Sequence, residues 1–193
     1  MSKWHRIALG TALTAATAGG LTLAGSAANA QTTSANPAAQ TSASGHSYSP
    51  SGKVRANEAV VEAFMRDVLD EHHGSHAAKY LTADMQWHGG TVGTVAGRDN
   101  VTGLMTTVVT SIPDLHAAQQ DIVAQGDEVV VRLVVTGTQT GPLLGIPASG
   151  RAVRWDAIDV YRLSDGKIAE EWAGEDFTAF LADTGTYKAP WIQ

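Results

Sequence analysis

The fold is decided by the stretch from Gly137 to Asp176, which reads GTQTGPLLGIPASGRAVRWDAIDVYRLSDGKIAEEWAGED. It begins at the end of one predicted strand and continues through a connection containing glycine and proline into a long strand, Arg151 to Leu163. A tight turn at Asp165-Gly166 leads to a further strand, Lys167 to Gly174. Charged residues lie inside these strands as well as at their ends. We therefore expect the strands to form one wall of a small-molecule pocket.

More strands are predicted on the N-terminal side of this stretch. Leu115 to Ala124 and Glu128 to Thr138 form two successive strands joined by a turn at Gly126-Asp127. A short strand or extended lip is predicted at Met85 to Thr91, and a last helical turn at Asp176 to Ala182.

Apolar residues recur at the helical period of 3.6 residues in the first half of the folded region. Three helices are predicted: from an N-cap at Asn57 to about Asp70, from His76 to Leu81, and from a cap at Asp99 to the stop at Pro113. Helices followed by a run of strands indicate an α+β domain. We expect a curved antiparallel sheet packed on three N-terminal helices.

The N-terminal part of the chain differs from the rest in composition. Residues 1–30 combine a basic start, an apolar middle and an Ala28-Asn29-Ala30 ending, which predicts a secretory signal peptide cleaved after Ala30. The alternative is an uncleaved membrane anchor. Residues 31–53 hold no large aliphatic residue and are predicted to be a disordered linker. Residues 54–193 are then one domain, secreted or extracytoplasmic, with no stable membrane insertion after cleavage.

The charge of the chain limits its partners. The formal net charge is -6, and removal of a leader that carries Lys3 and Arg6 but no acid would make it -8. An acidic domain without basic runs argues against binding to nucleic acid or to anionic membranes. The chain has no cysteine, so neither disulfides nor thiolate ligands are available.

Several short motifs occur in a fixed order between Gly137 and Phe177. They are Gly137 and Gly141, Gly145-Ile146-Pro147, Gly150-Arg151, Asp165-Gly166-Lys167-Ile168, Glu170 or Glu171 with Trp172, and Asp176-Phe177. In this order and spacing they resemble the SnoaL-like polyketide cyclase (ester cyclase) family of the nuclear transport factor 2-like superfamily. The resemblance implies a cone-shaped α+β barrel whose open end holds an apolar ligand, often in a homodimer.

The resemblance also implies acid/base chemistry without a cofactor, in which an aspartate moves a proton during an intramolecular aldol closure. Other members of the superfamily are ketosteroid isomerases, dehydratases, epoxide hydrolases and proteins without known catalysis, so fold alone does not decide function. Counted from Asp165-Gly166-Lys167-Ile168, the catalytic aspartate of the cyclases corresponds to Ala173 here, and an assisting histidine corresponds to Asp159. This departure argues against the specific cyclase activity more than against a pocket.

Strand alternation selects the candidate catalytic carboxyl groups. Trp155, Ala157, Asp159 and Tyr161 share one face of the long strand, and Ala169, Glu171 and Ala173 share a face of the next, opposite Ile168, Glu170 and Trp172. In the family's orientation Asp159 and Glu171 point into the cone. Two buried carboxyls raise each other's pKa, so one could act as a base and the other as an acid. The alternative is an exposed or interfacial acid paired with Arg132 or Arg154.

Other polar and aromatic residues complete the predicted site. His88 corresponds to a polar pocket position of many relatives and could donate to a carbonyl or accept a proton; the alternative is a surface histidine. Trp87 and Trp155 could form flat walls for a ring-bearing ligand, or pack in the core. Tyr161 and Asp176 join the predicted ligand-binding set.

Arg132 lies in the apolar strand Val129 to Val135, where a buried charge would need a partner. It could bind a ligand oxyanion or pair with Asp159. A salt bridge on a dimer face is the alternative.

Three histidines, His72, His73 and His76, raise the question of a metal site. His72 and His76 are four residues apart, but Gly74-Ser75 is expected to break the helix between them. No acidic or thiolate partner has a diagnostic spacing. A solvated helix end is favoured, and no metal ligand is predicted.

These observations lead to two hypotheses. The first is an exported protein that binds a small, apolar, oxygenated molecule and catalyses its cyclisation, isomerisation, dehydration or hydrolysis. Asp159 would be the principal acid or base, and His88 and Glu171 would assist. The second, which Ala173 favours, is a non-catalytic ligand-binding or dimerising module of the same fold.

Overall fold

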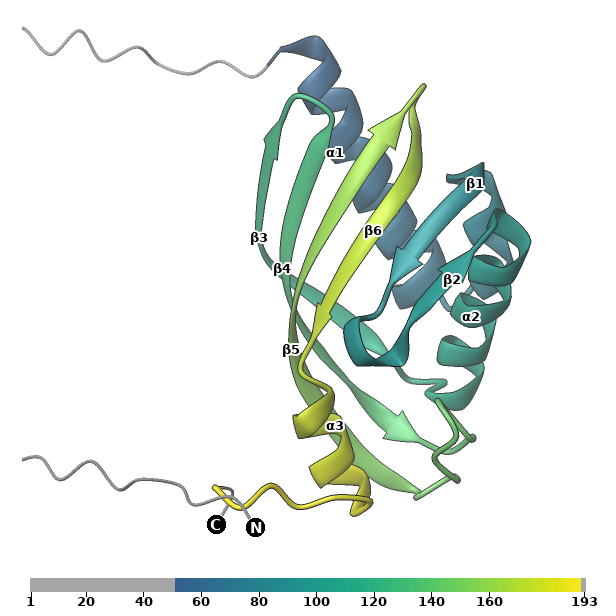
Figure 1. Ribbon diagram of the computed structural model, residues 1–193, viewed down its shortest axis with the longest axis vertical. Coiled ribbons are helices and arrows are strands. Elements are labelled where there is room, and N and C mark those ends of the chain that lie inside the picture. Colours follow the sequence, from purple (N-terminus) through teal and green to yellow (C-terminus); the bar gives the residue numbers. More distant parts are fainter. Residues whose placement is uncertain (1–50, 192–193) are drawn as a thin grey trace, which may run out of the picture. The chain divides into compact units, whose positions relative to one another are not determined.

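The helices come first and the long strands follow, as predicted (Figure 1). The computed structural model describes residues 51–191. The predicted leader and the predicted linker up to residue 50 lie outside the described residues. Within residues 51–191, no helix has both the length and the apolar character needed to cross a membrane.

The first helix starts earlier than the sequence suggests. α1, Gly52–Phe64, is capped by Ser51, whose hydroxyl accepts a hydrogen bond of 3.3 Å from the Val54 N–H. It continues as a π-helix, η1, Met65–Asp70. The prediction that Asn57 caps this helix is wrong: Asn57 is buried inside α1, and its Nδ2 donates to the Gly126 carbonyl at 3.1 Å. That contact attaches the helix to the turn at Gly126-Asp127.

Three more helical elements and the first two strands of the sheet precede β3, His116–Gln125. η2, Gly74–Lys79, is a 3-10 helix, and α2, Arg98–Ser111, begins after Gly97 rather than at a cap on Asp99. Between them lie β1, Leu81–His88, the single 3-10 turn η3, Gly90–Val92, and β2, Thr94–Ala96.

The remaining strands form one sheet with β1 and β2. They are β3, His116–Gln125; β4, Glu128–Gln139; β5, Arg151–Ser164; and β6, Lys167–Glu175. The strand order is β2-β1-β6-β5-β4-β3, and every neighbouring pair is antiparallel except β1 with β6, which is parallel. The fold is therefore α+β with a mostly antiparallel sheet. α3, Phe177–Thr184, follows β6 and is capped by Asp176.

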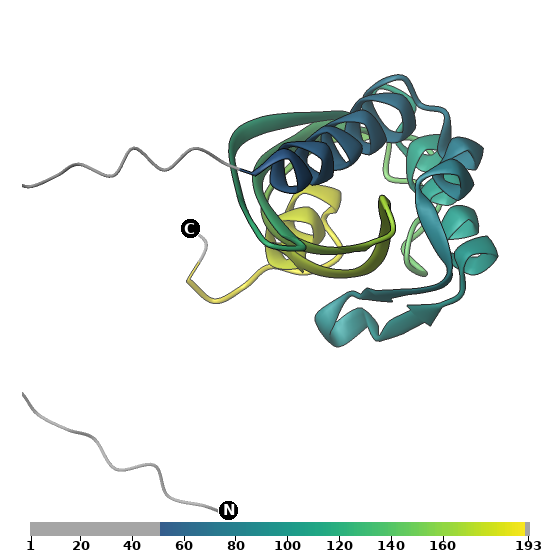
Figure 2. The same cartoon turned by 90° about the horizontal axis from the view of Figure 1, so that it is seen from above.

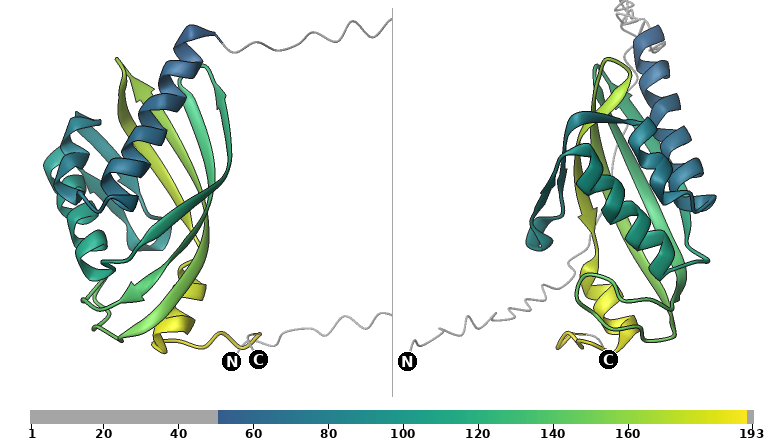
Figure 3. Two further views of the ribbon diagram at one scale, coloured as in Figure 1. Left: turned by 180° about the vertical axis from the view of Figure 1, so that it is seen from behind. Right: turned by 90° about the vertical axis from the view of Figure 1, so that its right-hand side faces the viewer.

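The sheet is strongly curved, and the helices cover its concave side. Figure 2 shows β3 to β6 curling round while α1 crosses the open side, and Figure 3 shows α1 and α2 in front of the concave face. On β5 the alternation is complete: Trp155, Asp159 and Tyr161 are buried, whereas Asp156 and Ile158 are exposed. The concave face is thus the inside of the domain.

A bulge changes the alternation at the start of β6. Leu163 pairs with Ile168, but Arg162 pairs with Glu170, so Ala169 is an extra residue in this strand. Ile168 is therefore fully buried on the same side as Glu171, not opposite it as predicted. From Glu171 onward the regular alternation resumes.

Close packing between η2 and α2 generates a stability prediction. A Cβ atom on Gly74 would lie 2.5 Å from the Thr106 Cα, which is backbone and cannot move aside. We expect Gly74→Ala to lower the free energy of unfolding by about 1–3 kcal/mol because the two elements must separate. Gly103→Ala is the matched control: a Cβ there meets nothing within 4 Å, and alanine should stabilise α2 by about 0.5–1 kcal/mol. Urea denaturation measures both, and equal effects would contradict the packing argument.

Candidate active site

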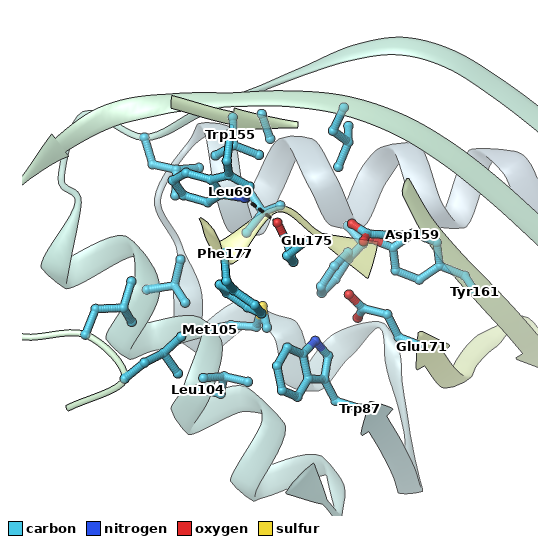
Figure 4. Close-up of a pocket in the computed structure, with 18 residues that line it drawn as sticks. Leu69, Trp87, Leu104, Met105, Trp155, Asp159, Tyr161, Glu171, Glu175 and Phe177 are labelled. Carbon is cyan, nitrogen blue, oxygen red and sulfur yellow. Dashed lines mark hydrogen bonds between the residues drawn. The ribbon is translucent and has the colours of Figure 1, made fainter. Parts of the chain in front are cut away.

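A cavity of about 80 Å³ lies between the concave face of the sheet and the helices. Its wall is mainly apolar and aromatic, with contributions from Phe64, Met105, Leu133, Trp87 and Trp155. Figure 4 shows Trp87, Met105 and Trp155 around a common space, with Phe177 directed into it from the start of α3.

Partly exposed side chains mark the mouth of the cavity. Leu104 and Val108 of α2 and Phe177 are half-buried, and Leu144 in the β4–β5 connection is 38% exposed. These residues belong to three different segments that meet at one end of the sheet. A ligand would enter between α2, the β4–β5 connection and α3.

Three carboxyl groups line this apolar cavity: Asp159 of β5, and Glu171 and Glu175 of β6. Asp159 is 3% exposed and Glu171 is 5% exposed. Asp159 pairs across the strands with Ala173, so Ala173 lies between the two glutamates in the inward row of β6. Figure 4 shows all three carboxyl groups directed toward the cavity.

The sequence prediction missed Glu175. The last strand was expected to end at Gly174, one residue too early, whereas β6 includes Glu175. Glu175 is two residues beyond Ala173 and four beyond Glu171, so the alternation would have placed it inward if the strand had been extended by one residue.

Burial changes the ionisation of all three groups. Desolvation raises the pKa of Asp159 well above its ordinary value, and the charges of Glu175 and Glu171 raise it further. Desolvation raises the pKa of Glu171 to about 8 and that of Glu175 to about 7. Burial likewise raises the pKa of the Tyr161 phenol well above its ordinary value, so this hydroxyl stays protonated.

The three groups differ in their hydrogen-bond partners. The indole N–H of Trp155 donates to Glu175 Oε2. Asp159 Oδ1 and Glu171 Oε2 are buried without a hydrogen-bond partner. Buried polar atoms are normally paired, because an unpaired one costs about 1–3 kcal/mol. These two oxygens are therefore free to bind a polar atom of a ligand.

The structure does not bring His88 to the cavity. Its Nε2 donates to Glu170 Oε1 at 2.8 Å, its Nδ1 accepts from the Thr94 hydroxyl at 3.2 Å, and its ring stacks on Trp172. Glu170 and Trp172 belong to the outer face of β6, and His88 is not among the residues that line the cavity. Its predicted role beside Asp159 has no geometric basis.

Arg132 and Asp176 also lie outside the cavity. Arg132 is exposed on the outer face of β4, while its neighbour Val131 is the residue paired with Asp159. Of the three alternatives given for Arg132, the pairing with Asp159 is excluded, because the two side chains lie on opposite faces of the sheet. Asp176 is exposed and caps α3, where its Oδ1 accepts from the Ala179 N–H at 3.1 Å. Of the predicted ligand-binding residues, Trp87, Trp155 and Tyr161 line the cavity.

Comparison with known proteins identifies the family. The model of the family described as SnoaL-like polyketide cyclase matches residues 59–184. The chain belongs to the SnoaL-like polyketide cyclase family. This confirms the resemblance carried by the motifs between Gly137 and Phe177.

Solved structures share the fold of this SnoaL-like protein. TsrD from Streptomyces laurentii is 26% identical with a TM-score of 0.61, and the match covers 69% of this chain and 97% of TsrD. A candidate SnoaL-like polyketide cyclase from Jannaschia sp. CCS1 is 23% identical with a TM-score of 0.64, covering 73% of this chain and 99% of that one. An LEH-like epoxide hydrolase from M. tuberculosis is 14% identical with a TM-score of 0.57, covering 68% and 91%. No curated protein matches the chain.

The raised pKa of Glu171 predicts how the stability of this SnoaL-like protein depends on pH. The group titrates near its ordinary value of 4.5 when unfolded and near about 8 when folded, so the folded state binds the extra proton between these values. Its contribution to stability is complete below pH 4.5 and is lost as the pH rises through about 8. Glu171→Gln cannot ionise, so its stability relative to the native chain should increase between pH 5 and pH 9, by on the order of 3 kcal/mol.

Urea denaturation at a series of pH values checks this expectation. Glu128→Gln, at the exposed start of β4, is the control and should leave the pH dependence of the native chain nearly unchanged. Parallel stability curves for the native chain and Glu171→Gln would contradict a buried, protonated Glu171.

Proposed function

We propose that this protein is an acid/base enzyme without a cofactor, acting on a small, largely apolar, oxygenated molecule. The observation that carries the proposal is the row of carboxyl groups in the apolar cavity, with unpaired oxygens on Asp159 and Glu171. Their raised pKa values place proton transfer close to neutral pH, where acid/base catalysts are most effective.

The three groups have different roles in this proposal. Glu175 has the lower pKa of the two glutamates, about 7, and its anion is stabilised by the Trp155 N–H. It is therefore the proton acceptor. Glu171, with its pKa raised to about 8, keeps its proton at neutral pH and donates to an oxygen of the ligand. Asp159, whose pKa is raised by burial and by the charges of Glu175 and Glu171, is the second donor.

One proton transfer is common to cyclisation, isomerisation and dehydration of carbonyl compounds. The Glu175 carboxylate takes a proton from the carbon next to the carbonyl, and the electron pair of that C–H bond forms a C=C bond. The carbonyl π electrons move to oxygen, which receives the proton of Asp159 or Glu171. The product is a neutral enol, and the negative charge has moved from Glu175 to the donor.

The cavity limits the size of the molecule. A volume of about 80 Å³ has room for several water-sized groups. A short-chain or single-ring carbonyl compound fits this space better than a polycyclic one. Trp87, Trp155 and Tyr161 supply flat surfaces for an unsaturated or cyclic ligand.

A non-catalytic ligand-binding module is the second candidate, and Ala173 favours it because it removes the carboxylate that the resemblance implies for cyclases. In our proposal the inward carboxyls on either side of Ala173 take over the proton transfer. The same proposal includes export of the chain, which the leader pattern of residues 1–30 supports. It also includes a homodimer, which the resemblance to the family supports.

Hydrogen exchange at carbon tests the proposal without requiring the natural product. Ligands retained by the purified chain are first identified by mass spectrometry, and related ketones and β-keto esters are incubated with the chain in D₂O. We expect deuterium to enter the carbon next to the carbonyl, with Glu175→Gln slowing the exchange by about 100-fold or more. Glu128→Gln should exchange at the native rate. Ligands that bind without exchanging, or equal rates for Glu175→Gln and the native chain, would favour the binding module.

The exchange rate should also depend on pH in a particular way. It rises as Glu175 loses its proton near pH 7 and falls as Glu171 ionises near pH 8, because the ionised Glu171 no longer donates. The profile is therefore a narrow bell. Glu171→Gln should lower the rate and remove the alkaline decline, because its amide N–H hydrogen-bonds to the oxygen at every pH but transfers no proton to it. An unchanged decline would assign the decline to another group.

A further inference from the structure

A second polar cluster lies at the junction of η1 and η2, away from the cavity. The Nδ1 atoms of His73 and His76 both lie close to one oxygen of Asp67, with distances to Oδ1 of 2.9 Å and 2.8 Å. One potential ligand atom from each residue lies within 4.8 Å of the other two. None of the three residues lines the cavity.

We propose that Asp67, His73 and His76 bind one divalent transition-metal ion, with Zn²⁺ the best match. Two imidazole nitrogens and a carboxylate oxygen are the donor types that Zn²⁺ prefers, whereas Mg²⁺ and Ca²⁺ prefer oxygen alone. Water would fill the fourth position, or Glu71, whose Oε2 lies 3.7 Å from His73 Nδ1.

The three side chains would have to move only slightly to coordinate a tetrahedral zinc ion. Bonds of about 2.0–2.1 Å from a tetrahedral ion hold neighbouring ligand atoms roughly 3.3 Å apart. The two nitrogens already lie within half an ångström of that separation from Asp67 Oδ1. An ion that enters takes the place of the hydrogen-bonding protons on Nδ1, which move to Nε2 or to solvent.

Neighbouring side chains fix the position of the Asp67 carboxylate. The Tyr80 hydroxyl donates to its other oxygen, Oδ2, at 2.8 Å and fixes the orientation of the carboxylate, as outer-shell partners of metal ligands do. Lys79 lies 3.6 Å from Oδ2 and opposes a cation, but its side chain is 57% exposed and can turn away.

The two other histidines nearby do not converge in this way. His72 Nε2 donates to the Leu115 carbonyl at 2.7 Å, so the pair that the sequence spacing suggested, His72 with His76, is not the pair that meets. His116 Nδ1 lies 3.0 Å from Asp70 Oδ1. His116 with Asp70 is therefore a matched control: one histidine and one aspartate at the same distance, without a second imidazole.

A bound ion would join η1 to η2 and stabilise the folded chain. Side chains of His73 and His76 are 50% and 37% exposed, so an ion can reach them from solvent. Because the ion binds the folded geometry and not the unfolded chain, the melting temperature rises with the concentration of free ion once that concentration exceeds the dissociation constant. This role is independent of the chemistry proposed for the cavity.

Zinc titration of the full chain, produced without a polyhistidine tag, tests the site. We expect one Zn²⁺ per chain by calorimetry, a higher Tm with zinc, and no comparable response to Mg²⁺. His73→Gln and His76→Gln should each weaken zinc binding about tenfold or more and abolish the rise in Tm, whereas His116→Gln should match the native chain. Co²⁺ in place of zinc should give visible absorption in the native chain and lose it in His76→Gln.

The proposal is overturned if the native chain takes up no zinc, or if both histidine variants bind zinc as tightly as His116→Gln. The Tm of each metal-free variant separates loss of the ion from loss of the fold. A variant that melts like the native chain without metal and still gains nothing from zinc supports the site.

Discussion

The unbroken pairing of β4 with β5 is the constraint on which the interior depends. Twelve residue pairs, from Glu128 with Arg162 to Gln139 with Arg151, keep a single register without a bulge. Because side chains alternate strictly along such a ladder, one register directs Trp155, Asp159 and Tyr161 inward together. A slip by one residue would expose all three and bury the charges of the outer face. The polar site and the apolar core are thus consequences of the same register.

Much of this arrangement could be read from the sequence, because alternation is a local property. The positions of β3 to β6, and the inward direction of Asp159 and Glu171, follow from a period of two residues. Ile168 was misplaced because the bulge at Ala169 depends on pairing with β5. His88 was misplaced because the face it takes depends on the parallel pairing of β1 with β6, which joins segments about eighty residues apart. Local patterns do not encode either contact.

Ala173 carries no carboxyl group, but the residues two positions before and after it on β6 both do, and both line the cavity. A small residue there pairs with Asp159 and leaves the cavity side of β6 to Glu171 and Glu175. The single aspartate that the resemblance implies is absent at Ala173, and three carboxyl groups line the cavity of this chain. The stability cost of these carboxyl groups and their affinity for protons have the same cause, which is burial. A buried oxygen without a partner lowers the stability of the folded chain, and the same burial raises the pKa of the group, so that its proton is available to a ligand.

The protonated carboxyls also alter how the whole molecule behaves in an electric field. The formal charge of -6 counts every aspartate and glutamate as ionised. Glu171, whose pKa is raised to about 8, keeps its proton near neutral pH only while the chain is folded. The folded chain is therefore less negative than its composition implies, and its isoelectric point is higher than that of the same chain unfolded. Part of the difference in electrophoretic mobility between the folded and the unfolded chain comes from this retained proton.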